Sequence, residues 1–168
     1  MSPPLFLTVE QGKDKSKIAE IKKAIKEGKN IFILLHWKNC GHCQTMLPEW
    51  RNIQNQKNIA NNVVIVDVEK DYMDALPKEI NVKNIVGYPT LRFIKKDFME
   101  DYEQSNITNK NRKLDSFVEW IKSKEPILEV ETEYSSRQHG GGKTRHKKRK
   151  THKKTRKNKN IGKWFWNL

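Results

Sequence analysis

Hydrophobic residues along the first 125 positions follow two periods, and each period predicts one kind of element. Apolar runs, continuous or alternating, predict strands at Leu5–Val9, Ile31–Trp37, Val63–Val68 and Thr90–Ile94, followed by an edge strand that holds Tyr102. Spacings of three and four residues predict helices at 16–30, after residue 43, at 71–80 and at 111–124. The expected element order is therefore β, α, β, α, β, α, β, β, α.

This order predicts the fold class. Strands that alternate with helices form a sheet with a parallel portion, which the helices cover. Ile31–Trp37 and Val63–Val68 are apolar on both faces, so helices are expected on both faces of the sheet. We therefore predict an α/β protein whose central mixed β-sheet is flanked by helices on both faces.

Charge divides the 168 residues into two segments. Residues 1–133 carry 21 Lys and Arg against 20 Asp and Glu, whereas residues 134–168 carry 13 basic residues and no acidic one. The net charge of +14 thus comes almost entirely from the end of the chain. So polar a segment buries too little apolar surface to offset its ordering entropy. We expect a domain at 1–130 and a basic, low-complexity, disordered tail with an aromatic tip at 131–168.

The N-terminal residues and the cysteine count bear on the compartment. The apolar run Leu5–Val9 is shorter than the core of a signal peptide, and no basic residue precedes it. No apolar run approaches the ~20 residues of a membrane span. The two cysteines enclose too short a loop to stabilise a secreted fold by a disulfide. We expect a non-secretory, cytoplasmic protein without signal peptide or transmembrane segment.

The two cysteines are Cys40 and Cys43, separated by a glycine and a histidine. Four interpretations are open: a zinc site, two inert core thiols, an inactive remnant of a redox site, and a dithiol–disulfide couple. Zinc sites usually need four ligands, and the chain has no second cysteine pair. A place between a buried strand and a helix start exposes the first thiol to free backbone N–H groups, which favour thiolate. This location favours the redox couple, and we expect neither a metal nor an organic cofactor.

Further motifs stand at informative separations from this pair. They are Pro48 and Trp50 in the helix that follows, the loop Gly87–Thr90 with the sequence Gly-Tyr-Pro-Thr, and Arg112 eight residues before Trp120. Together with the Cys-Gly-His-Cys stretch, they resemble the thioredoxin-like superfamily, and in particular the catalytic domains of protein disulfide isomerase. The resemblance covers about residues 5–125. It implies a thioredoxin fold and a thiol–disulfide oxidoreductase that acts on protein thiols and disulfides.

The resemblance also implies roles within the cysteine stretch. Cys40 would attack a substrate disulfide, and Cys43 would resolve the mixed disulfide that forms. Gly41 and His42 would support the pair, because positive charge on His42 near the Cys40 sulfur lowers the pKa of that thiol. A stabilised thiolate makes the disulfide more oxidising, so a potential nearer the isomerase value of about −180 mV than the thioredoxin value of about −270 mV is expected.

Three supporting residues outside that stretch follow from the same resemblance. Tyr88 and Pro89, joined by a cis peptide bond, would pack beside the thiols and form the substrate groove with them. Arg112 would approach the site and lower the pKa of Cys43, unless it remains a solvated cation at the start of the last helix.

The chain departs from the resembled pattern at two positions. Asn39 stands where the isomerase domains carry a tryptophan, and Leu34 stands where they bury a carboxylate that moves protons for the resolving thiol. Without that carboxylate, the proton of Cys43 must leave through water or another group. His36, at the end of the central strand, is interpreted as a half-exposed structural residue rather than as a substitute proton carrier.

The tail predicts a second kind of function. Its basic run at 143–159 is suited to a polyanion, either nucleic acid or an anionic membrane surface, unless it serves nuclear import or solubility alone. The alternative to an enzyme is therefore a redox-weak binding module of the thioredoxin fold, tethered by its tail. The tail also resembles ends of proteins encoded by giant DNA viruses, which implies packaging in a virion.

Overall fold

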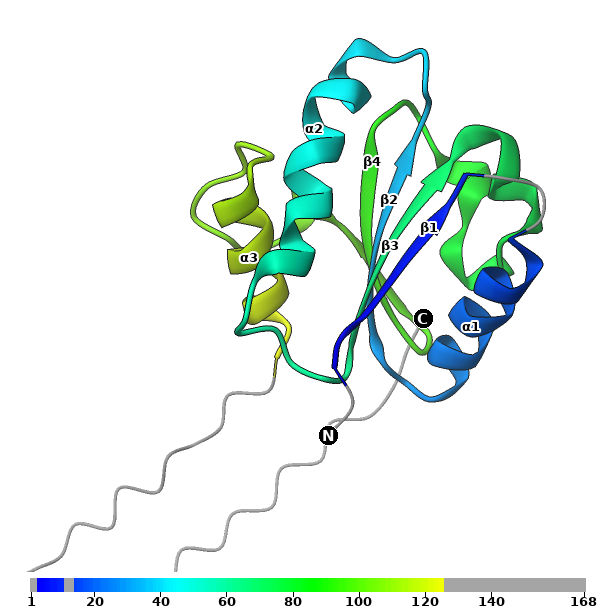
Figure 1. Cartoon of the computed structure of the whole chain (residues 1–168), viewed down its shortest axis with the longest axis horizontal. Helices are drawn as coiled ribbons and strands as arrows, with labels where there is room; N and C mark the ends of the chain where they lie inside the picture. The colour runs from blue at the N-terminus through cyan, green and yellow to red at the C-terminus, as the bar shows by residue number, and fades with distance from the viewer. Residues whose placement is uncertain (1–2, 11–13, 126–168) are drawn as a thin grey trace, which may run out of the picture. The chain divides into compact units, whose positions relative to one another are not determined.

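The computed structural model describes residues 3–10 and 14–125 (Figure 1). The tail predicted at 131–168 lies outside the described residues, and the domain boundary near residue 130 stays a prediction. The described part forms a mixed β-sheet with helices on both of its faces. None of the described helices is long and apolar enough to cross a membrane.

The sheet has the order β1-β3-β2-β4-β5. Strands β1, β2 and β3 are parallel, β4 is antiparallel to β2, and β5 is antiparallel to β4. This arrangement confirms the predicted fold class. The elements are β1 (Leu5–Val9), α1 (Lys15–Lys26), β2 (Asn30–His36), α2 (Gly41–Arg51), β3 (Val63–Glu69), β4 (Thr90–Lys95), β5 (Phe98–Asp101) and α3 (Leu114–Ser123), with short 3₁₀ helices at Asn52–Asn55, Lys70–Ala75, Lys78–Ile80, Val82–Asn84 and Tyr102–Gln104.

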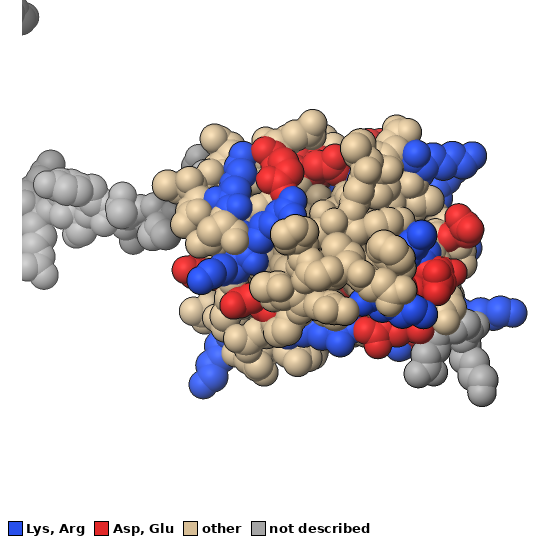
Figure 2. Space-filling model, turned by 90° about the horizontal axis from the view of Figure 1, so that it is seen from above, with Lys and Arg blue, Asp and Glu red and all other residues tan. Residues whose placement is uncertain are grey.

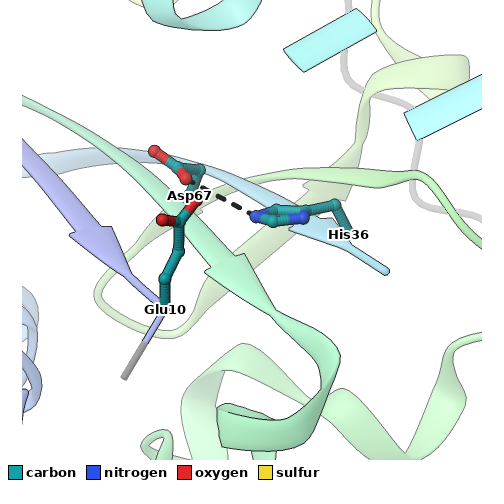
Figure 3. A group of neighbouring side chains, drawn as sticks. All are labelled: Glu10, His36 and Asp67. Carbon is teal, nitrogen blue, oxygen red and sulfur yellow. Dashed lines mark ion pairs between the residues drawn. The ribbon is translucent and has the colours of Figure 1, made fainter. Parts of the chain in front are cut away.

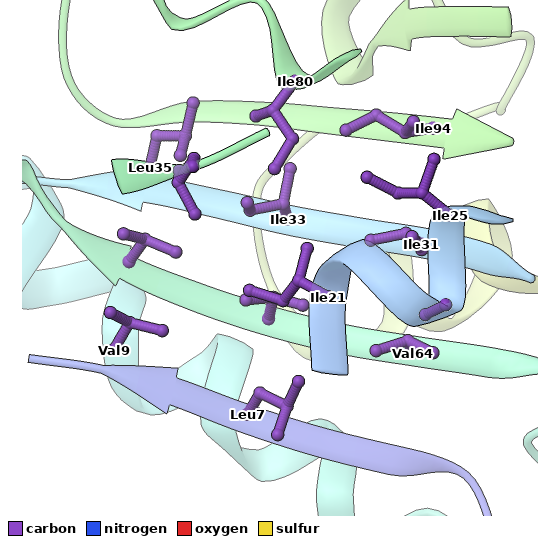
Figure 4. Packing of buried hydrophobic residues seen from close by; sticks show 14 of the residues in the cluster. Leu7, Val9, Ile21, Ile25, Ile31, Ile33, Leu35, Val64, Ile80 and Ile94 are labelled. Atoms are coloured by element: carbon purple, nitrogen blue, oxygen red, sulfur yellow. The ribbon is translucent and has the colours of Figure 1, made fainter. Parts of the chain in front are cut away.

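Helix α1 covers one face of the sheet. Its Ile21 and Ile25 lie against alternate residues of the central strand, Ile31, Ile33 and Leu35 (Figure 4). All five side chains are at most 7% exposed. Apolar residues three and four positions apart on the helix thus pack against apolar residues two positions apart on the strand. Both hydrophobic patterns could therefore be recognised in the sequence.

Helices α2 and α3 share the other face, where the core is aromatic. The Trp120 ring of α3 meets Phe32 of β2 edge-on, with 4.9 Å between ring centroids, and Trp50 of α2 meets Phe117 of α3 at 5.2 Å. Such edge-to-face pairs add to the stabilisation that burial alone provides. They fix α2, the helix that begins beside the cysteines, against the sheet.

Two expectations of the sequence analysis were wrong in detail. Strand β5 ends at Asp101, and Tyr102 instead opens a 3₁₀ helix with its ring completely buried against Phe117 and Trp120. The segment 71–80 is two 3₁₀ helices rather than one helix, separated by extended backbone around Pro77. Proline lacks the N–H that a continuous helix requires, so the interruption follows from its covalent structure.

Arg92 of β4 is a buried cation that holds the segment leading to the Tyr88–Pro89 loop. Its side chain is 2% exposed, and its guanidinium donates hydrogen bonds to the carbonyls of Ile80, Asn81 and Asn84 and to the carboxylate of Asp101. The Arg92 side chain therefore joins strand β4 to the segment 80–84. Removing a buried donor leaves its acceptors unsatisfied, which costs more than the bond itself contributes.

We predict that Arg92→Met lowers the free energy of unfolding by about 2–4 kcal/mol, because three carbonyls lose their donor. Urea denaturation followed by tryptophan fluorescence measures the loss. The matched control is Arg112→Met, which breaks an ion pair with Glu103 that is partly exposed on both sides and should cost at most about 1 kcal/mol. Equal losses in the two variants would contradict the anchoring role.

Candidate functional site

The two cysteines lie where β2 leads into α2. Cys40 is the N-cap residue of α2, and its sulfur accepts a hydrogen bond from the backbone N–H of Cys43 at 3.4 Å. Cys43 follows in the first turn of the helix and is 1% exposed, whereas Cys40 is partly exposed. Both are free thiols. The junction therefore presents one sulfur to solvent and buries the other beneath it.

The Tyr88–Pro89 loop faces this pair. The peptide bond between Tyr88 and Pro89 is cis, as the resemblance implied. The Cys40 thiol lies 3.6 Å from the carbonyl oxygen of Tyr88, to which it donates a hydrogen bond. Val86, two residues before Tyr88, is fully exposed. The accessible thiol thus lies beside a loop in which Val86 is exposed, Tyr88 is half-buried and Pro89 is buried.

The surroundings of the two thiols shift their pKa values in opposite directions. Interaction with the Cys43 side chain is the largest effect on Cys40 and lowers its pKa. Partial burial raises this pKa, and the backbone N–H groups of Cys43 and His42 lower it further. Burial, as the largest cause, and the hydrogen bond with Cys40 together raise the pKa of Cys43 to about 11. Of the two thiols, Cys40 therefore forms the thiolate, which is the nucleophilic form.

The other predicted residues differ in how close they come to the sulfurs. Gly41 and His42 occupy the exposed first turn of α2. His42 affects Cys40 through its backbone N–H, and the role of its imidazole stays a prediction. Arg112 pairs with Glu103 at 2.5 Å, and its charge makes only a minor contribution that lowers the pKa of Cys43.

His36 is buried, and the expectation of a half-exposed residue was wrong. It is 3% exposed because β2 stays paired to its last residue, where His36 lies opposite Glu69 of β3. Its Nε2 points toward Asp67 of β3 and lies 3.5 Å from Oδ1 of that carboxylate (Figure 3). A polar pair is thus buried at the carboxyl end of two neighbouring strands.

Asp67 remains ionised despite its burial. Burial alone would raise the pKa of this carboxyl group, but His36, Arg51 and Thr8 together lower it below the ordinary value. Arg51 donates to Oδ1 at 2.8 Å and Thr8 donates to Oδ2 at 2.7 Å. Charged and neutral donors around a carboxylate stabilise its ionised form.

The same cluster could supply ligand atoms to a metal ion. Atoms of Glu10, His36 and Asp67 lie within 4.8 Å of one another. The guanidinium of Arg51, however, is paired with both Glu10 and Asp67. A divalent cation between these carboxylates would face that fixed positive charge, so the arrangement is better suited to an ion-pair cluster than to a metal centre.

A cavity of about 340 Å³ borders Glu10 and His36 of this cluster. Its lining includes Cys43, His36, Trp37, Glu10 and Glu69. Since one water in the liquid occupies about 30 Å³, the cavity has room for several water molecules. Glu10 and His36 of the cluster therefore border the same cavity as Cys43.

The sequence analysis missed Asp67. Its signal was present: a single carboxylate stands inside the otherwise apolar run Val63–Val68. A charged residue in a strand that is buried on both faces requires partners, since an unpaired buried charge is strongly disfavoured. Its partners are Arg51 from α2 and His36 from the neighbouring strand β2. The run Val63–Val68 alone does not identify them.

We predict that iodoacetamide distinguishes the two thiols at pH 7. Cys40, with its lowered pKa and exposed sulfur, should react at least about 10²-fold faster than Cys43, whose buried thiol stays protonated. Each rate is measured by mass spectrometry on the variant that keeps only that thiol, Cys43→Ser or Cys40→Ser. Similar rates in the two variants would show that the environments do not separate the thiols.

We predict that Asp67 makes stability depend on acid pH. Its pKa is lowered in the folded state. The carboxylate therefore stabilises the fold at pH values above its ordinary pKa of about 3.9. This stabilisation is lost as the pH falls through about 3.9 and then through the lower pKa of the folded state. Asp67→Asn should be less stable than the parent by about 1–3 kcal/mol at pH 7. The difference, measured by urea unfolding, should shrink toward pH 2; a constant difference would contradict the role of the charge.

Comparison with known proteins agrees with this geometry. The family profile described as Thioredoxin matches residues 12–123. The chain is 31% identical over 70 residues to protein disulfide-isomerase A2 of Mus musculus and 29% identical over 107 residues to protein disulfide-isomerase 1 of Dictyostelium discoideum. These matches cover 42% and 62% of this chain, but only 12% and 27% of those relatives.

Among solved structures, the first thioredoxin domain of mouse protein disulfide-isomerase A4 aligns with a TM-score of 0.47 and 19% identity, over 77% of this chain and 85% of that one. The family profile spans most of the described residues, from α1 through the cysteine pair and the Tyr88–Pro89 loop to the last residue of α3. On this match, the chain belongs to the thioredoxin family.

Proposed function

We propose that the protein is a thiol–disulfide oxidoreductase, similar to the isomerases, with Cys40 and Cys43 as its redox pair. The observation that carries this proposal is the opposite shift of the two pKa values at a helix start: lowered for the accessible thiol and raised to about 11 for the buried one. Inert core cysteines would both be buried and both be protonated. In this pair the accessible thiol is the one that ionises more easily, as the attacking thiol must.

The reaction proceeds through a mixed disulfide. The Cys40 thiolate attacks one sulfur of a substrate disulfide, whose S–S bond breaks and whose second sulfur leaves as a thiolate. Cys43 then loses its proton and attacks the Cys40 sulfur, which expels the remaining substrate sulfur. The chain's dithiol is oxidised to a disulfide, the substrate disulfide is reduced to a dithiol, and both departing thiolates take up protons. The reverse sequence oxidises a substrate dithiol.

Proteins are the proposed substrate class. The Tyr88 carbonyl lies next to the Cys40 sulfur, and Val86, two residues before Tyr88, offers an extended substrate an exposed apolar contact. Figure 2 views the molecule from the end where β2 leads into α2 and shows an uncharged area bordered by basic and acidic side chains. Such a surface accepts many peptide sequences, because no single sign of charge dominates it.

Polyanion binding by residues 143–159 lies outside the described residues and stays a prediction. The same holds for the cytoplasmic or virion location and for the alternative of a tethered binding module. The enzyme interpretation has the stronger support, because the Cys40 sulfur lies within hydrogen-bond distance of the Cys43 backbone N–H and the Tyr88 carbonyl.

We predict a reversible Cys40–Cys43 couple with a reduction potential between about −270 and −150 mV. The purified full chain is equilibrated in glutathione buffers, and its free thiols are trapped and counted by mass spectrometry. A low thiol pKa stabilises the dithiol form, so a value toward the upper end of this range is expected.

The control is Cys40→Ser, which should abolish the intramolecular couple while leaving the fold unchanged by circular dichroism. If the parent chain forms no disulfide anywhere in this range, or one that is never reduced, the proposed function is overturned.

A further inference from the structure

Resolution of the mixed disulfide poses a proton-transfer problem in this chain. Cys43 is 1% exposed and its pKa is raised to about 11, so near neutral pH almost none of it is thiolate. It must nevertheless attack as a thiolate. A group that can take the proton must therefore be reachable from the sulfur, and burial leaves the shared cavity as the route.

His36 is the group in this cavity that is suited to accept a proton. Its imidazole lines the cavity together with Cys43. Its Nε2 is buried, lies 3.5 Å from Asp67 and has no well-aligned hydrogen-bond partner. A protonated imidazole there would be stabilised by the Asp67 carboxylate, which is ionised and fixed from two sides by Thr8 and Arg51.

The other acids of the cavity are engaged elsewhere. Glu69 accepts hydrogen bonds from the backbone N–H groups of Asp71 and Lys38. Glu10 is paired with Arg51, and Asp71 is paired with Lys38. Each of these carboxylates is thus already held by a donor or a cation. Histidine is the side chain whose ordinary titration range brackets neutral pH.

We propose that His36, held and charge-balanced by Asp67, accepts the proton of Cys43 through water in the shared cavity during the resolving step. This inference rests on the proposed oxidoreductase function and assigns its missing proton acceptor. Asp67 is the positioning residue, since it acts through His36 and not on the sulfur.

The Cys43 S–H bond breaks, and its proton passes through water to the His36 imidazole, which becomes imidazolium beside the Asp67 carboxylate. The Cys43 thiolate forms the S–S bond with Cys40, and the bond between Cys40 and the substrate breaks with its electron pair on the substrate sulfur. That thiolate takes up a proton, and His36 returns its own to solvent through the cavity.

The test separates attack from resolution in one experiment. The reduced full chain is mixed in a stopped-flow instrument with less than one equivalent of 5,5′-dithiobis(2-nitrobenzoate), an aromatic disulfide whose two thiolates absorb visible light. Attack by Cys40 releases the first thiolate and resolution by Cys43 releases the second. Cys43→Ser should show only the first phase.

His36→Gln retains a donor for Asp67 but has no atom that takes up a proton near neutral pH. We expect its first phase to be unchanged and its second phase to slow about 10²-fold at pH 7, the lower range for loss of a general base. The deficit should narrow as the pH approaches about 11, where Cys43 ionises without assistance.

Other charged or titratable groups around the imidazole can also affect the pH dependence of the second phase. These are Glu10 beyond β1, Lys38 after β2, Cys43 and Arg51 on α2, and Asp67, Glu69, Asp71 and Tyr72 on or after β3. The matched control is Asp71→Asn, because its carboxylate lines the same cavity but is 58% exposed. It should leave both phases unchanged.

A second variant covers the case in which glutamine at this position impairs folding. His36→Ala enlarges the cavity, and added imidazole should restore its second phase in proportion to concentration. An unchanged second phase in His36→Gln overturns the proposal. So does an equal loss of both phases, which would indicate a structural role, or a slow second phase in Glu69→Gln alone, which would assign the proton to Glu69.

Failure of this proposal differs from failure of the proposed function. If the parent chain itself gives no second phase and no reversible couple, the oxidoreductase function falls. If the parent gives both phases and His36→Gln matches it, the function stands and only the assignment of the proton acceptor is wrong.

Discussion

The pairing of β2 on both of its edges is the constraint on which the site depends. All seven residues of β2 are buried, with β3 parallel on one side and β4 antiparallel on the other. Because β4 runs the opposite way, its first residue Thr90 lies opposite Leu35, near the end of β2. The Tyr88–Pro89 loop, just before β4, and Cys40, just after β2, must therefore meet at the same edge of the sheet.

The difference between the two thiols follows from where that junction starts the helix. The N-cap residue Cys40 has extended backbone and a partly exposed side chain. The Cys43 side chain lowers its pKa most, and the free N–H groups of the first turn lower it further. Three residues later the helix has turned toward the sheet, and Cys43 lies in the core. One helical turn thus places two neighbouring sulfurs in environments that shift their pKa values in opposite directions.

Local patterns in the sequence accounted for much of this structure, and long-range partners account for what they missed. The strands, the helix faces and the cysteine junction rest on spacing within one segment, so the sequence alone predicted them. The burial of His36 and the hydrogen bonds of Arg92 depend on groups from other elements, Asp67 in one case and the carbonyls of residues 80–84 in the other. No pattern within β2 or β4 specifies those partners.

Asp67 shows why the position of a buried carboxylate in space matters more than its position in the sequence. Leu34 occupies the place where the resemblance led us to expect a carboxylate, and this chain has none there. In the parallel register Leu34 lies opposite Asp67, so a carboxylate is present at the same level of the sheet on the next strand. A charge one strand away is too far to act on Cys43 by contact. An intermediate group is then required, and His36, two residues beyond Leu34 on the same face of β2 and within 3.5 Å of Asp67, spans that separation.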